Sequence, residues 1–570
     1  MRIDAKQEGP RQSMSWLHTW ASLILGWLLY AIFLTGTLSF FQNEITVWMK
    51  PELHQSVPQN SQIQQTQVAL NYLQKNHPNA GSWNIQLPNA RQNTTILTVR
   101  KIGEDPRARR GGERITLDSA TGEVLKARDT RGGSFLYRFH FELYGLPRLW
   151  TRWLVGIATL LMLVAIISGV ITHKKIFKDF FSFRAGKGQR SWLDAHNATA
   201  VLALPFHIMI TFSGLLLLLF TLMPWGINQI YENRGQFLQE QSRALVENKE
   251  NRNERAEGRN TERQNNSQAR GKNTEQAGEK RQQRQKPEAQ PAPLADIAPI
   301  LATAQQKWKD NPVGSISIIA PNTNQGTIEL RALLGESVAH RNVYDSLEFN
   351  AVTGQNITDD SSRLKNPSVP MAIYNVVTVL HEARGVDLAL RWLLFCSGIV
   401  GTLMVATGLI LWCVKRAPQQ QKQGYKSFGY RIVEVTNITA IIGLPLACAA
   451  YFYANRFIPA QMELRSDWEI RSFFIIWLLS LIYAALRPHR QAWLELLAFA
   501  TLAFALLPVI NFMTGGQALW NSIANGQWMI ASFDLAMWLL AILFFYSYQK
   551  VKNHKGLPVK KAKVTQEPEA

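Results

Sequence analysis

Long apolar runs separated by polar stretches dominate the pattern of hydrophobic and polar positions along this chain. An α-helix needs about 20 predominantly apolar residues to cross a bilayer. Eight runs of suitable length and composition predict an α-helical polytopic membrane protein with about eight membrane-spanning helices. The predicted spans are 16–42, 151–172, 197–223, 390–413, 436–454, 472–486, 492–512 and 528–548.

Two long polar regions interrupt the first four spans, at residues 50–149 and 224–389. Each contains an amphipathic helical pattern followed by alternating strand-like runs, and each ends in a similar strand and Thr-Gly turn, SATGEVL and AVTGQNI. We therefore expect one small α+β module in each region. Residues 247–293 contain no Val, Ile, Leu, Met or aromatic residue. This insert cannot bury enough apolar surface to offset chain entropy, so we expect it to be disordered.

The net charge of +20 does not indicate nucleic-acid binding, because the basic residues are distributed by membrane side. They concentrate in the loop 173–196, in the segment after the fourth span and in the tail 549–570. Under the positive-inside rule these segments and the amino terminus, 1–15, are cytoplasmic, and the two large polar regions lie outside. The basic residues are Lys174, Lys175, Lys178, Arg184, Lys187, Arg190, Lys415, Arg416, Lys422, Lys426, Arg431, Lys550, Lys552, Lys555, Lys560, Lys561 and Lys563.

The first four spans show signs of an internal repeat. SWLHTW opens the first span and SWLDAH the third. The separation from His18 to Gly36 equals that from His196 to Gly214, 18 residues in each case. Eighteen residues are about five helical turns, so each pair shares a helix face. We expect two copies of the arrangement helix, exported module, helix.

A second set of matching positions follows the exported regions. His140 in FHFELY and His381 in LHEARG each come shortly before the next span. Within the second and fourth spans, Gly169 in SGVITHKK matches Gly408 in TGLILWCVK, so that His173 stands where the other half has Trp412.

The histidines fall at particular depths in this topology. His18, His173 and His196 lie near the cytoplasmic boundary, His140 and His381 lie near the exterior boundary, and His207 lies within the bilayer. An intramembrane histidine can simply hydrogen-bond a neighbouring helix, but ionisable groups at that depth are costly and often functional. The other five histidines, for which we expect solvent exposure, are His54, His77, His340, His489 and His554.

The chemistry of these groups favours haem over zinc. Neither depth has a cysteine at the short spacing from its histidines that is common in tetrahedral zinc sites. Paired imidazoles from facing helices in an apolar bundle suit the two axial positions of a haem iron. Two haems at different depths would let an electron cross the membrane.

Several segments resemble one known family. The segments SWLHTWASLILGWLLYAIFLTGTLSFFQNEI and GVITHKKIFKDFFSFRAGKGQRSWLDAHNATAVLALPFHIMITFSG, with the strand-turn tails TGE and TGQ, are similar to the PepSY-associated transmembrane helix family over about residues 13–416. The resemblance implies a bacterial inner-membrane protein with periplasmic PepSY domains, often linked to iron supply. Some members are ferric-siderophore reductases that carry two b-type haems.

The resemblance also implies a set of haem ligands. It assigns His18, His173 and His196 to a cytoplasmic-side haem, and His140, His207 and His381 to an outer haem. Relatives often have a second histidine in the segment FHxxLH, where this chain has Tyr144. No catalytic residue is assigned.

The expected function is transfer of electrons across the inner membrane to reduce a ferric siderophore in the periplasm. The glycine-rich stretch AGKGQRS lacks the preceding strand and the spacing of a dinucleotide fingerprint, so electrons must come from quinol or a separate cytoplasmic donor. The alternatives are a siderophore or metal permease and a non-enzymatic PepSY binding or regulatory protein. The last four spans contain no histidine, and we expect a packing, quinol-binding or transport role for them.

Overall fold

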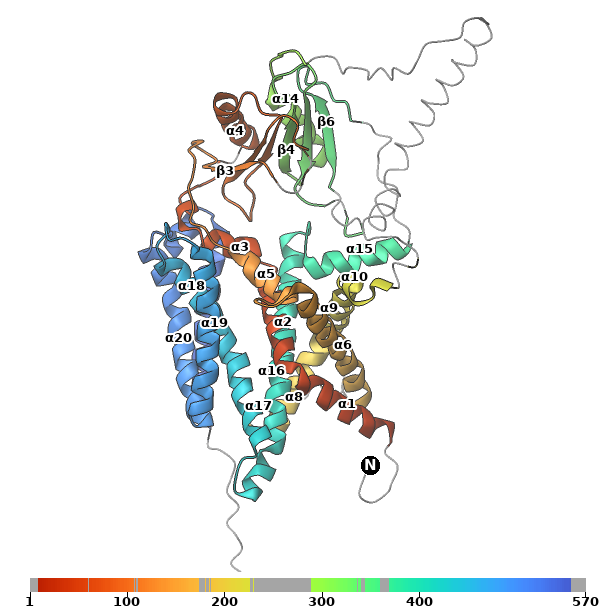
Figure 1. The fold of residues 1–570 in the computed structure, drawn as a ribbon, viewed down its shortest axis with the longest axis vertical. Helices are drawn as coiled ribbons and strands as arrows, with labels where there is room; N and C mark the ends of the chain where they lie inside the picture. Colours follow the sequence, from red (N-terminus) through yellow and green to blue (C-terminus); the bar gives the residue numbers. More distant parts are fainter. Residues whose placement is uncertain are drawn as a thin grey trace, which may run out of the picture.

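A computed structural model of the chain describes residues 9–554 except 60, 107, 109–110, 174–179, 181–183, 185, 226–228, 230–288, 336, 340–343 and 359–368. It shows an elongated helical body with a small β-sheet at one end (Figure 1). Most of the predicted insert 247–293 and most of the predicted tail 549–570 lie outside the described residues. The basic loop 173–196 lies outside them only at 174–179, 181–183 and 185, and its last residues belong to a helix that begins at Gln189.

The helical body has six continuous helices long and apolar enough to cross a membrane, or eight spans if two bent helix pairs are included, within the residues that the structure describes. The chain is therefore a multi-pass membrane protein. The first four spans are formed by α1 (Pro10–Ile24) with α2 (Gly26–Ser39), α6 (Arg148–Thr172), α8 (Gln189–Leu202) with α9 (Leu204–Leu217), and α16 (Leu388–Gln423).

Two of these spans are broken, whereas the apolar pattern predicts continuous helices. The axis bends by 65° between α1 and α2, at Leu25, and by 67° between α8 and α9, at Ala203. Pro205, at the start of α9, cannot donate a backbone hydrogen bond to the preceding turn. Gly26, at the start of α2, lies so close to α16 that a Cβ there would be 2.7 Å from Leu409 Cδ2.

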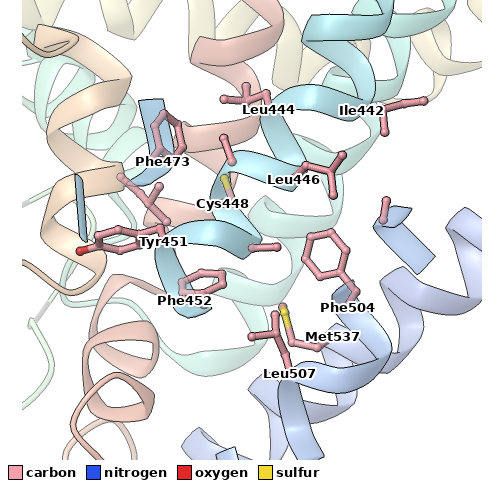
Figure 2. Close-up of a cluster of buried hydrophobic side chains, with 14 of the residues drawn as sticks. Ile442, Leu444, Leu446, Cys448, Tyr451, Phe452, Phe473, Phe504, Leu507 and Met537 are labelled. Atoms are coloured by element: carbon pink, nitrogen blue, oxygen red, sulfur yellow. The ribbon is translucent and has the colours of Figure 1, made fainter. Parts of the chain in front are cut away.

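The remaining spans form a second bundle. The span Phe428–Phe457 consists of α17 (Phe428–Ile438), a π-helical turn η3 (Thr439–Gly443) and α18 (Leu444–Phe457). Around α18 lies a core of buried apolar side chains that includes Tyr451, Phe473 and Phe504 (Figure 2). The other helices are α19 (Arg465–Leu486), α20 (His489–Met513), the short α21 (Leu519–Ala524) and α22 (Trp528–Lys552).

The two large polar regions together build one antiparallel sheet with the strand order β3-β2-β1-β4-β5-β6. The sequence predicts two modules but not their union through β1 and β4, where Trp83 pairs with Ile318. The two modules share one hydrophobic core. The first contributes α4 (Gln62–Asn76), β1 (Ser82–Gln86), β2 (Thr95–Arg100) and β3 (Glu113–Leu117), and the second contributes α14 (Ile297–Trp308), β4 (Val313–Ile319), β5 (Thr327–Ala332) and β6 (Ser346–Asn350).

Each module ends in the Thr-Gly turn seen in the sequence. Gly122 and Gly354 have φ values of +78° and +68°. This left-handed backbone favours glycine, so both turns have the conformation that the sequence pattern predicts.

Short helices connect the sheet to the membrane bundle. Figure 1 shows α3, α5 and α15 at the end of the helical body that faces the sheet. Their bounds, with those of two further short helices, are α3 (Gln42–Trp48), η1 (Pro51–Leu53), α5 (Gly133–Glu142), α10 (Leu219–Leu222) and α15 (Val369–Glu382).

Candidate functional site

Four of the six candidate histidines form two facing pairs. His18 on α1 faces His196 on α8, with 6.2 Å between the ring centroids and 61° between the ring planes. His140 on α5 faces His381 on α15, with 6.0 Å between centroids and 47° between planes. We call these the inner pair and the outer pair. The outer pair lies on helices next to the sheet, and the inner pair lies on helices away from it (Figure 1).

Backbone carbonyls orient both rings of the inner pair. His18 Nδ1 lies 2.8 Å from the carbonyl oxygen of Ala165 on α6, and His196 Nδ1 lies 3.0 Å from that of Met404 on α16. A carbonyl only accepts hydrogen bonds, so Nδ1 carries the proton in each neutral ring. The lone pair of each Nε2 is left available for a ligand bond.

The outer pair is oriented in a similar way. His140 Nδ1 donates to the carbonyl oxygen of Ile32 at 2.8 Å. His381 Nδ1 lies 2.8 Å from Ser213 Oγ, and this hydroxyl lies 2.6 Å from the carbonyl oxygen of Met209, to which it donates. The hydroxyl is therefore able to accept a hydrogen bond from His381 Nδ1–H.

Each of the four rings lies against a glycine of a neighbouring helix. A Cβ at Gly169 would lie 3.1 Å from His18 Cε1, and one at Gly408 would lie 3.1 Å from His196 Cε1. At the outer pair, a Cβ at Gly36 would lie 2.7 Å from His140 Cε1, and one at Gly214 would lie 3.4 Å from His381 Cε1. The absence of a side chain at these glycines therefore makes room for the imidazoles.

The family model for the PepSY-associated TM region matches residues 15–415, which is more than half of the chain. The chain belongs to the PepSY-associated TM family. No curated protein matches the chain. The PepSY-associated region includes all six candidate histidines and the sheet, and it ends before α17.

His207, the fifth candidate within the PepSY-associated region, stands apart from both pairs. Its side chain is fully buried on α9, near the backbone carbonyl of Ala200, but neither ring nitrogen makes a hydrogen bond of good geometry to a described residue. Its ring lies edge-on to Phe33, with 6.4 Å between centroids, and Nε2 would be 3.3 Å from a Cβ at Gly401. On α16, Gly401 is seven residues before Gly408, so His207 lies about 10 Å along that helix from the level of the inner pair.

His173, the sixth candidate, caps the C-terminal end of α6. Its Nε2 lies 2.8 Å from Asn197 Nδ2, which is the donor when Nε2 is unprotonated. In the part of the chain that the structure describes, no group of three or more His, Cys, Asp or Glu side chains could hold a metal ion. Among the six candidates, the structure thus pairs His18 with His196 and His140 with His381, and it places His207 and His173 outside these two pairs.

The expectation that His54 is exposed is wrong. This histidine, which follows η1, is fully buried. Its Nε2 donates to the carbonyl oxygen of Val47 at 3.0 Å, and Nδ1 accepts from the backbone N–H of Gln517 at 3.2 Å. Burial, and to a lesser extent the charge of Arg456, lowers the pKa of His54 to about 3, so the ring is neutral at physiological pH.

Proposed function

We propose that this protein binds two b-type haems and carries electrons across the bacterial inner membrane to reduce a ferric siderophore in the periplasm. The observation that carries the proposal is the presence of two facing histidine pairs at different depths of one helical bundle. In both pairs, Nδ1 of each ring lies within hydrogen-bond distance of a backbone carbonyl or a hydroxyl on a neighbouring helix.

The spacing of each pair fits haem. Two imidazoles bound to opposite faces of one iron, at about 2 Å from each nitrogen, have ring centroids about 6 Å apart. The inner and outer pairs have centroid separations of 6.2 Å and 6.0 Å. His18 and His196 would hold one haem, and His140 and His381 the other.

An internal duplication would account for this arrangement. His18 bonds the residue four positions before Gly169, and His196 bonds the residue four positions before Gly408. The bent spans also break at equivalent places, seven residues after His18 and seven after His196. In the proposed arrangement, each haem is held by one histidine from each copy.

The protein's own side chains would tune the two sites. Bound haem supplies a one-electron carrier at each depth. Hydrogen bonds from Nδ1–H hold the rings in position and increase the basicity of Nε2; the acceptor is a carbonyl oxygen for three rings and the Ser213 hydroxyl for His381. A buried apolar cluster that includes Leu29, Ile32 and Met162 packs between helices of the same bundle.

The substrate follows from the chemistry of iron chelates. A ferric siderophore holds Fe(III) in hard oxygen ligands, and Fe(II) is held less tightly and exchanges more readily. The basic loops would face the cytoplasm, so that the sheet and the outer pair face the periplasm and the chelate. Electrons would enter at the inner pair from quinol or a cytoplasmic donor.

Proteoliposomes test this function directly. Vesicles are loaded with dithionite, and a ferric siderophore and a chromophoric Fe(II) chelator are added outside. We expect Fe(II) to form outside vesicles that contain the protein. Formation at the rate of protein-free vesicles would contradict the proposal.

A pair of glycine substitutions should affect the outer site unequally. The Cβ of Gly36→Ala would meet the His140 ring at 2.7 Å, so we expect this variant to lose more than half of its outer haem. Gly214→Ala is the matched control, because its Cβ would be at an ordinary contact distance of 3.4 Å from His381. Haem content per chain is measured after purification. Equal haem contents in the two variants would contradict the geometry of the outer pair.

His207→Leu is expected to retain both haems. The corresponding position in the first copy is Leu29, and a buried polar group without a partner costs about 1–3 kcal/mol. We therefore expect two haems per chain and an unfolding temperature at or above that of the unmodified protein. Loss of one haem would instead make His207 an axial ligand, as the resemblance implies.

A further inference from the structure

Two segments link the sheet to the membrane helices near the outer pair. The first contains α3 and η1 and follows α2, and the second leads through residues 128–132 into α5, which carries His140. Both segments dock on the second bundle, α17–α22, which lies outside the PepSY-associated region. Figure 1 shows α3 beside the end of α18.

Trp48, the last residue of α3, is the centre of the first docking site. Its side chain is fully buried. The indole stacks on Phe533 with 4.3 Å between ring centroids, and the guanidinium of Arg456 lies 4.2 Å from its ring centroid. Nε1 donates to Asp534 Oδ1 at 2.8 Å. A single tryptophan thus contacts α18 and α22 together.

Asn511 on α20 completes this site. Its Oδ1 accepts from Arg456 Nη2 at 2.7 Å, and its Nδ2 donates to Asp534 Oδ2 at 3.1 Å. Arg456 Nη2 also donates to the carbonyl oxygen of Trp48. Buried charges add little net stability, but they disfavour any docking in which their partners are missing. The network therefore specifies one seating of α3.

The second docking site holds the segment before α5. Arg465 and Glu469 form a fully buried ion pair on α19. Glu469 Oε2 accepts from Thr130 Oγ1 at 2.6 Å, and Arg465 Nη1 donates to the carbonyl oxygen of Asp129 at 2.9 Å. Tyr451 Oη donates to the carbonyl oxygen of Gly132 at 3.0 Å, directly before α5 begins.

Aromatic packing continues this contact along α5. Phe135 and Phe139 lie edge-on to Phe473, with 5.2 Å and 5.6 Å between ring centroids. Phe139 directly precedes His140. Tyr144 stacks on Phe474 with 5.7 Å between ring centroids. One side of α5 therefore packs on the second bundle, and the other presents His140 to α2.

We propose that the second bundle is a clamp that seats α3 and α5 and so sets the position of the His140 ring at the outer pair. Trp48 and Phe139 are positioning residues in this clamp. The expected effect on haem rests on the proposed function. The seating of α5 by the clamp does not depend on haem. The inner pair, oriented by carbonyls of α6 and α16, serves as an internal reference.

The experiment compares full-length variants in detergent. Trp48→Leu removes the tryptophan at the centre of the first docking site, and Asp534→Asn only weakens the hydrogen bonding around it. Trp20→Leu, on the exposed face of α1, is the control. Redox titration and low-temperature EPR are measured on each. The His18→Ala and His140→Ala proteins assign the signals to the inner and outer haems.

We expect Trp48→Leu, and to a smaller degree Asp534→Asn, to shift the potential and broaden the EPR signal of the outer haem alone. Unchanged outer signals in both variants, or equal changes in both haems, would overturn the clamp. Hydrogen exchange separates this failure from failure of the proposed function. Faster exchange of α5 relative to α1 in Trp48→Leu would support the clamp even in a protein that binds no haem, and unchanged exchange of α5 would overturn it.

Discussion

His140→Ala is expected to halve the haem content per chain and to reduce electron transfer to an external ferric chelate to the protein-free rate. The reason is geometric. His140 and His381 face each other at 6.0 Å, so removal of one ring would leave only one of the two imidazoles that would hold the outer haem. The inner pair does not share residues with the outer pair and should keep its haem. Pyridine haemochrome quantitation and the vesicle assay measure the two effects.

Two further proteins make this result specific. His77→Ala, in the sheet region, changes a histidine outside both pairs and is expected to keep two haems and full activity. His18→Ala is expected to lose the inner haem, and its electron transfer to the external ferric chelate should also fall to the protein-free rate. Unaltered haem content in both His18→Ala and His140→Ala would refute the assignment of ligands.

The second large effect concerns the buried ion pair of α19. Glu469→Leu leaves the charge of Arg465 buried without its partner, and breaking such a pair costs about 3–5 kcal/mol. The double variant Arg465→Met/Glu469→Leu removes both charges and is expected to regain most of that loss. Thermal unfolding of the full chain in detergent measures both.

An exposed pair provides the control for this experiment. Arg487 and Glu495 also form an ion pair, at the other end of α19, but both side chains are partly open to solvent. Glu495→Leu should therefore change the unfolding temperature much less than Glu469→Leu does. A double variant of the buried pair that is no more stable than Glu469→Leu would show that the apolar replacements do not fit the site.

The membrane spans were the most predictable part of the fold, because a continuous apolar run of sufficient length has few alternatives. The bends were not predicted. Apolar residues continue through Leu25 and Ala203, and only Pro205 gives a local signal of a break. The π-helical turn η3 has a similar signal, because Pro445 follows it by two residues, but the apolar run around it still predicts one span.

The sequence pattern also did not predict that the two modules join into one sheet. Strand patterns predict that β1 and β4 exist, but alternation does not identify the partner of a strand more than 200 residues away. Both strands alternate buried apolar residues, such as Ile85 in β1 and Ile316 in β4, with polar ones, and this pattern indicates one buried face but no particular partner. The pairing itself became visible only in the structure.

At the candidate site, the equal spacings from His18 to Gly36 and from His196 to Gly214 predicted which residues share a helix face. They did not predict which atoms form hydrogen bonds. The carbonyls of Ala165 and Met404 orient the inner pair, and any residue type supplies a carbonyl. The burial of His54 is similarly invisible, because its partners are the backbone of Val47 and of Gln517.

The most direct test of the two-haem account is the reduced-minus-oxidised absorption spectrum of the purified full-length protein, combined with pyridine haemochrome quantitation. We predict Soret and α bands of six-coordinate b-type haem at two haems per chain. A dithionite-reduced sample without these bands, prepared from cells with sufficient haem supply, would contradict the account.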